Sequence, residues 1–130
     1  EYVCNSVTHA LPAQFNGTDW LDVSYHENRW SLDISERIPY LEQVVKSCKE
    51  HGLNPGISST SGDWARVMGS QEAGSDLLSA VSVRYANDDW VADFWDFEIH
   101  GFGTWEKPQM KNYKSNTYLC EFFVSSINYF

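Results

Sequence analysis

The clearest pattern along the chain is a helical one that runs from Ser35 to about His51. Apolar side chains recur there at spacings of three and four residues, which places one set on a single helix face: Ile38, Leu41, Val44, Val45 and Cys48. Ser35 is a residue type that caps helix N-termini, and Gly52 followed by Pro55 is typical of a helix end. The pattern predicts one amphipathic helix with both ends marked.

Short apolar and β-branched runs alternate with helical segments in the rest of the chain. The predicted strands and apolar runs are Thr18 to Tyr25, Leu53 to Ser59, Leu77 to Ala86, Met110 to Lys114 and Val124 to Phe130. Ser61 can cap a brief helix that contains Trp64, Val67 and Met68 and stops at Gly69. This alternation predicts an α/β fold with a mostly parallel sheet and flanking helices, in which loops at the carboxyl ends of strands carry any site.

Composition adds that residues 1–130 form a single globular domain, with 42% hydrophobic and 21% charged residues. The 18 acidic residues outnumber the 9 basic ones and give a net charge of -9. Because this charge repels phosphate groups, we expect neither nucleic acid nor an anionic membrane surface as a partner. No apolar run approaches the roughly 18 residues that a membrane span needs, so we expect a soluble chain, already processed if it is secreted.

Three isolated cysteines, Cys4, Cys48 and Cys120, lack the close pairs that zinc sites use. In a secreted protein an odd count leaves a thiol that is either free or linked to another chain, whereas buried apolar side chains are the alternative. The pairing stays open. The triplet from Asn16 to Thr18 matches the N-glycosylation pattern, which favours an extracellular location.

The remaining chemistry-bearing residues predict no cofactor and no metal. The four histidines are scattered, without ligand or triad spacing. The acidic loop from Asp88 to Glu98 lacks the spacing and central glycine of a calcium loop, so we expect its charges to be solvated.

Five segments in order resemble the lysozymes of glycoside hydrolase family 25, in the form found in protists and nematodes. They are WLDVS at 20–24, GLNPGISSTSGDWARVMGS at 52–70, VRYA at 83–86, FGTWEKPQMKNY at 102–113 and LCEFFVSSINYF at 119–130. The fourth is the most specific, because the family reads Phe-Gly-Gly-Trp-x-Lys-Pro-x-Ile-Lys-Gln-Tyr there. The resemblance covers about residues 20–130 and implies a partial or rebuilt form of the family's modified TIM-type barrel.

The resemblance also implies where muramidase chemistry would lie, and of the family's carboxylates there only Asp22 has a counterpart. The family strand reads Trp-Leu-Asp-Ile-Glu, so Asp22 is kept and Ser24 stands at the position of the catalytic acid. A family aspartate near the C-terminus aligns with Ser126. Glycoside hydrolysis needs a proton donor, which serine cannot be near neutral pH. We therefore predict a non-catalytic module that binds glycan or serves as a subunit of an extracellular assembly; the alternative is an active muramidase that uses Asp22 with Glu27 as a displaced acid.

The first strands of the family barrel have no counterpart here, since about twenty residues before Trp20 cannot encode them. An open half barrel leaves unpaired strand edges. Three accounts are open: a second chain, joined through a disulfide or not, completes the barrel; the chain is part of a longer precursor; or the sheet is rebuilt as a smaller open fold.

Aromatic side chains are candidates for sugar contacts, because their faces can stack on sugar rings. The resemblance places Tyr85 and Tyr113 towards the groove, and Trp105 is a further candidate; Trp90 and Trp95 lie in a loop. Packing in the core is the more common role of such residues. It is the one we favour for Trp105, as for Trp64.

Overall fold

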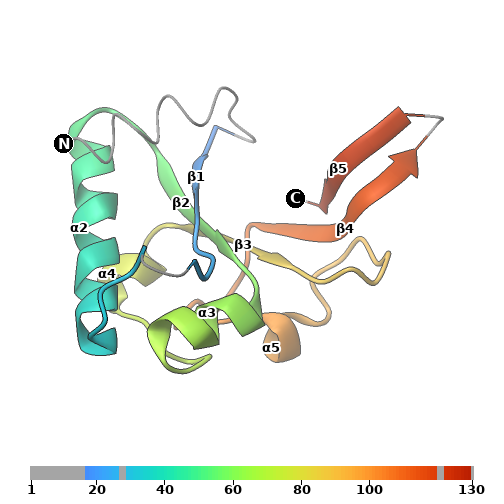
Figure 1. Cartoon of the computed structure of the whole chain (residues 1–130). Coiled ribbons are helices and arrows are strands. Elements are labelled where there is room, and N and C mark those ends of the chain that lie inside the picture. The colour runs from blue at the N-terminus through green and yellow to red at the C-terminus, as the bar shows by residue number, and fades with distance from the viewer. Residues whose placement is uncertain (1–16, 27–28, 120–121, 130) are drawn as a thin grey trace.

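The computed structural model describes residues 17–26, 29–119 and 122–129, and the strands among them form one five-stranded sheet in the order β1-β2-β3-β4-β5 (Figure 1). The elements are β1 (Asp19–Asp22), η1 (Ile34–Glu36), α2 (Arg37–Glu50), β2 (Pro55–Ser59), α3 (Ser61–Met68), α4 (Asp76–Ser79), β3 (Ser82–Ala86), α5 (Phe97–His100), β4 (Met110–Leu119) and β5 (Phe122–Tyr129).

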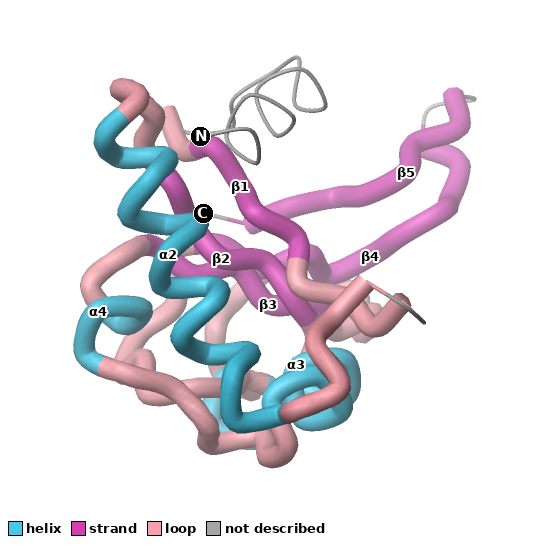
Figure 2. Tube along the Cα trace, turned by 60° about the vertical axis from the view of Figure 1, so that its left-hand side comes forward, coloured by secondary structure: helices cyan, strands magenta, loops and turns pink. Residues whose placement is uncertain are grey.

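Strands β1 to β4 run parallel, and β5 pairs with β4 in the antiparallel direction. The predicted α/β fold with a mostly parallel sheet and flanking helices is confirmed. The antiparallel last strand follows from chain length, because two residues separate β4 from β5 and a parallel crossover needs a dozen or more. In Figures 1 and 2 this hairpin extends away from α2 and α3. Closure of the sheet into a barrel stays a prediction.

The two faces of the sheet differ in character. One face packs against the helices and supplies buried core residues from three neighbouring strands: Leu21, Val23, Ile57, Val83 and Tyr85. Successive residues of a strand point to opposite faces. The intervening positions Asp22, Ser58 and Arg84 therefore lie on the face away from the helices. This alternation separates the core from the polar side chains of the candidate site.

Helix α2 follows the predicted pattern, and four of its predicted apolar residues are buried: Leu41, Val44, Val45 and Cys48. It ends at Glu50, and Gly52 just beyond it has the left-handed φ of +79° that glycine adopts readily; the Leu53 N–H donates to the Cys48 carbonyl at 3.0 Å. The predicted cap at Ser35 is wrong. Ser35 lies in η1, where the Asp33 carboxylate accepts its backbone N–H at 3.0 Å.

A guanidinium group joins α2 to α3. Arg37 is buried in the first turn of α2, and its Nη1 donates to the Val67 carbonyl at 2.8 Å. Its Nε donates to the Ser31 carbonyl, also at 2.8 Å. A cation at the last turn of α3 is favourable because helix C-termini carry unpaired carbonyls and partial negative charge. The contact fixes how the two helices pack over the sheet.

Three aromatic rings, of Trp64, Phe102 and Trp105, pack against one another in the core. Trp64 stacks on Phe102 with ring centroids 4.8 Å apart, and Trp105 meets both rings edge-on at 5.7 Å. The indole N–H of Trp64 donates to the Ala73 carbonyl and that of Trp105 to the Val81 carbonyl. Both tryptophans thus pack in the core with their polar atoms satisfied.

Two boundaries differ from prediction because side chains upstream cap the helices. Thr60, not Ser61, caps α3: its hydroxyl accepts the Asp63 N–H at 3.0 Å. Ser75 caps α4, so the apolar run from Leu77 to Ala86 divides into a one-turn helix and β3. None of the described helices is long and apolar enough to cross a membrane.

The α3 cap predicts a measurable difference between adjacent residues. Replacing Thr60 by Ala removes the oxygen that accepts the Asp63 N–H, and we expect a loss of about 1 kcal/mol in the free energy of unfolding. Ser61→Ala leaves that bond in place and serves as the control in the same urea titration. A larger effect at Ser61 than at Thr60 would contradict the assignment.

Candidate functional site

The candidate site lies where β1 ends, on the sheet face away from the helices. Asp22 is opposite Ser58, and Ser58 is opposite Arg84, in the parallel register of three adjacent strands. Arg84 Nε donates to Ser58 Oγ at 2.9 Å, and Arg84 Nη1 donates to Asn128 Oδ1 at 3.4 Å. The row therefore places one carboxylate and one guanidinium on a shared surface, with a serine between them.

The Asp22 carboxylate is unfavourably placed for its charged form. Although the side chain reaches solvent, burial raises the pKa of Asp22 most; the positive charge of Arg84 opposes this rise, and the negative charge of Asp63 adds to it. Burial also lowers the pKa of Arg84, against the opposing effect of Asp22. The net result is an aspartate that holds its proton more tightly than an ordinary one.

Ser24, which the resemblance aligns with the family acid, lies two residues after Asp22. Its hydroxyl lies 3.1 Å from His26 Nε2 and hydrogen-bonds with Asp22. The Trp30 indole donates to the Ser24 carbonyl at 3.0 Å, which holds the segment after β1 in place. A cleft of about 290 Å³ opens here, and its lining residues are Asp22, Ser24, His26, Arg29, Trp30 and Tyr40.

Other predicted site residues are placed elsewhere. Glu27 and Asn16 lie outside the described residues, as do Cys4 and Cys120; Cys48 is buried in the core. Ser126 lies on β5, where its backbone pairs with Ser115, two residues before the Asn128 that accepts from Arg84.

The predicted sugar-facing aromatics divide by burial. Tyr85 is fully buried, with its ring 5.2 Å from that of Phe97 and its hydroxyl bound to Asp96, and Trp105 is 8% exposed. Tyr85 is corrected to a packing residue, because its ring has no exposed face, and Trp105 packs in the core as favoured from the sequence. Tyr113 is half-buried, and its carbonyl accepts the Trp90 N–H at 3.1 Å. It stays a candidate for sugar contact.

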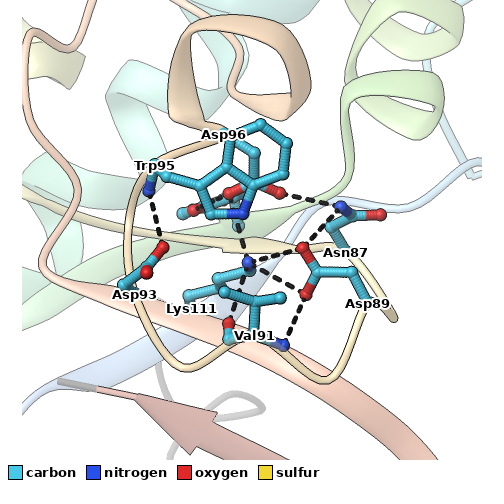
Figure 3. A network of polar contacts seen from close by, with 8 residues as sticks. Asn87, Asp89, Val91, Asp93, Trp95, Asp96 and Lys111 are labelled. Carbon is cyan, nitrogen blue, oxygen red and sulfur yellow. Dashed lines mark hydrogen bonds and ion pairs between the residues drawn. The ribbon is translucent and has the colours of Figure 1, made fainter.

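Sequence reasoning missed a buried ionic network beneath the acidic loop (Figure 3). Lys111 has no exposed side-chain surface, and its Nζ lies 3.1 Å from both Asp89 carboxylate oxygens and 3.2 Å from Asp96 Oδ1. Nζ also donates to the Val91 carbonyl at 3.0 Å. The loop is thus tied to β4 through one ammonium group.

Asp96 is bound from two further sides. The Tyr85 hydroxyl donates to Asp96 Oδ1 at 2.5 Å and Asn87 Nδ2 to Asp96 Oδ2 at 2.7 Å. Burial alone would raise the pKa of Asp96, but hydrogen bonds from Tyr85, Asn87 and Lys111 and the charge of Lys111 together hold it below its ordinary value. Burial and the adjoining Asp96 raise the pKa of Tyr85 well above its ordinary value, so the phenol remains a donor.

The expectation that this acidic loop is solvated is therefore wrong for Asp89 and Asp96. The signal available in the sequence was Lys111, a charged residue within a predicted strand opposite the apolar run that contains Tyr85. Over the described stretches of chain, no group of three or more histidine, cysteine or acidic side chains could hold a metal ion.

The network predicts a severe effect for one lysine and a mild effect for another. Lys111→Met leaves the buried Asp96 without its cation, and we expect the free energy of unfolding to fall by about 3–5 kcal/mol. Lys107→Met removes the same charge from an exposed position, and we expect a change within about 0.5 kcal/mol. Equal denaturation midpoints for the two variants would show that the network contributes nothing.

Replacing Asp22 should raise the stability of the fold, the opposite of the effect expected for Lys111. Its pKa is raised in the folded state, so the folded chain disfavours the carboxylate and loses stability as pH rises through that pKa. Asp22→Asn should therefore have a higher denaturation midpoint than the natural chain at pH 7, with a gap that shrinks as pH falls and Asp22 takes up its proton. The exposed-loop variant Asp88→Asn controls for net charge. A midpoint at pH 7 below that of the control contradicts the inference.

Comparison with known proteins shows which family the sequence matches. A family model described as lysozyme-like protein 1 matches residues 7–113. The chain is 32% identical over 114 residues to "Probable GH family 25 lysozyme 3" of Dictyostelium discoideum, which covers 88% of this chain and 22% of that protein. It is 28% identical over 111 residues to counting factor 45-1 of the same organism, covering 85% and 35% of the two chains. Identity to counting factor 50 is 30% over 101 residues, covering 78% and 32%.

The chain spans between about a fifth and a third of the length of these relatives. No solved structure matches it. The family model covers far more than half of the chain, and the matched region contains Asp22, Ser24, Arg84 and Lys111. The resemblance to family 25 lysozymes is confirmed, and the chain belongs to the lysozyme-like protein 1 family.

Proposed function

We propose that the chain is a non-catalytic, extracellular lysozyme-like module that binds glycan or serves as a structural subunit of an assembly. One observation carries the non-catalytic part: Ser24 stands beside Asp22 where the family strand places its acid, and its hydroxyl bonds with Asp22 and lies 3.1 Å from His26. A serine hydroxyl cannot supply the proton that the departing sugar oxygen requires.

The chemistry requires two groups, and among the described residues one carboxylate lines this cleft. Retaining and inverting glycosidases both place a pair of carboxyl groups about 5–10 Å apart across the scissile bond. Asp22 is the acidic residue among those that line the described cleft, and Arg29 also lines it. Arg84 adds a second positive charge near Asp22, on the same face of the sheet. Loss of one positioned general acid commonly lowers the rate by about 100- to 10,000-fold.

A weak muramidase is the second candidate, and the raised pKa of Asp22 beside Asp63 is what favours it. A carboxyl group with a raised pKa is what a general acid needs, and Asp63 is a second carboxylate close enough to raise it further. Asp22 would then donate the proton itself, with Glu27 or Asp63 as its partner.

The extracellular location and the partner are parts of the same proposal. The glycosylation triplet at Asn16 and the lysozyme-like relatives support secretion. Among the described strands, β1 and β5 form the two edges of the sheet, so a second polypeptide that pairs with an edge and completes the barrel is compatible with the fold.

A turbidity assay on bacterial cell walls separates the two candidates. We expect no clearance by the natural chain or by Asp22→Asn, and retention on sedimented walls reports glycan binding separately from lysis. Ser24→Glu restores a carboxyl group beside Asp22, and we expect any gain of lysis to occur in this variant. Clearance by the natural chain that disappears in Asp22→Asn, Glu27→Gln or Asp63→Asn would overturn the non-catalytic assignment.

A further inference from the structure

The loop between β3 and β4 exposes two tryptophans that the cleft around Asp22 does not use. Trp90 is 54% and Trp95 is 62% exposed, and none of the residues lining the Asp22 cleft comes from this loop. Indole rings are large apolar surfaces that folding or binding normally removes from water. Two of them within six residues of one loop mark a surface that contacts something else.

The Lys111 ionic network holds the residues next to both tryptophans in place. Asp89 and Asp96 contact the same Lys111 Nζ, at 3.1 and 3.2 Å. Trp90 follows Asp89 in the sequence, and Trp95 precedes Asp96. Figure 3 shows the Trp95 side chain beside the network that holds Asp96. The residues that adjoin the two tryptophans in the sequence are therefore held at one ammonium group, although four residues separate Trp90 from Trp95.

The backbone of the loop is held in a defined conformation. Trp90 has a left-handed φ of +60°, which is uncommon for a residue other than glycine. Its N–H donates to the Tyr113 carbonyl at 3.1 Å, and the next N–H, of Val91, donates to Asp89 Oδ1 at 3.0 Å. Fixing the loop before a ligand arrives lowers the ordering entropy that binding would otherwise cost.

The chemistry around the indoles favours an uncharged sugar. Indole faces can stack on the apolar faces of sugar rings, and the exposed carboxylates of Asp88 and Asp93 can accept hydrogen bonds from hydroxyl groups. The net charge of -9 and the acidic loop repel glycans that carry carboxylates or sulfates.

We propose that Trp90 and Trp95 form a binding surface for uncharged oligosaccharides, presented on a loop that the Lys111 network fixes. This surface lies outside the cleft that contains Asp22 and Ser24. The inference rests on the proposed glycan binding and names where that binding occurs and which class of glycan is bound.

Binding is measured by calorimetry on the full chain with oligomers of glucose, N-acetylglucosamine and galacturonate of equal length. We expect an uncharged oligomer to bind and the galacturonate oligomer not to bind. Trp90→Ala and Trp95→Ala should each weaken binding about tenfold, which an aromatic contact of about 1.4 kcal/mol gives. Leu32→Ala, which truncates a 99% exposed apolar residue outside the loop, should bind as the natural chain does. Thermal midpoints confirm that each variant is folded.

The outcomes separate this surface from the broader proposal. One outcome is that an oligosaccharide binds, that Tyr40→Ala in the cleft weakens this binding, and that both tryptophan variants bind normally. This outcome refutes the loop surface, while glycan binding by the module stands. If no sugar binds and the chain is not retained on cell walls, glycan binding fails as a whole. Binding of a lysine-rich peptide that depends on Trp90 and Trp95, without sugar binding, would reassign the surface to a protein partner.

Discussion

A single buried ammonium group organises the carboxyl end of this sheet. Lys111 lies on β4 with no exposed side-chain surface, and burial of an unpaired charge is far more costly than a fold of this size tolerates. Asp89 and Asp96 therefore pair with this ammonium group, and these ion pairs hold the loop after β3 against β4. Tyr85 and Asn87 then complete the shell of Asp96, so core packing and loop conformation follow from one ion group.

The aspartate pKa values shift in opposite directions around Lys111 and at Asp22. Around Lys111 the pKa values of Asp89 and Asp96 are held down, because hydrogen bonds and a cation outweigh burial. At Asp22 burial prevails over Arg84, and the pKa is raised. The difference lies in the surroundings: the Asp96 carboxylate is bound by Lys111, Tyr85 and Asn87, whereas Asp22 has the Ser24 hydroxyl and the charge of Arg84 against its burial.

Sequence patterns predicted the parts of this structure that depend on local periodicity. The apolar spacing from Leu41 to Cys48 placed α2, and the strand and helix alternation gave the α/β sheet; the motif at 20–24 brought Asp22 and Ser24 together. Contacts between distant residues were beyond such patterns. The partners of Lys111 lie 15 and 22 residues away, and a cap at Thr60 rather than Ser61 depends on one backbone angle. Burial of Tyr85 follows from Phe94 and Phe97, which no strand pattern placed over its ring.

Ser24 and Arg84 both determine the surroundings of Asp22. The Ser24 hydroxyl hydrogen-bonds with Asp22, and Arg84 places a cation on the same face of the sheet. The cation lowers the pKa of Asp22 from where burial and Asp63 alone would place it. A general acid needs its proton at working pH. Arg84 therefore opposes the shift that would let Asp22 keep a proton to donate, while its bonds to Ser58 and Asn128 link β3 to β2 and β5 on the same face of the sheet.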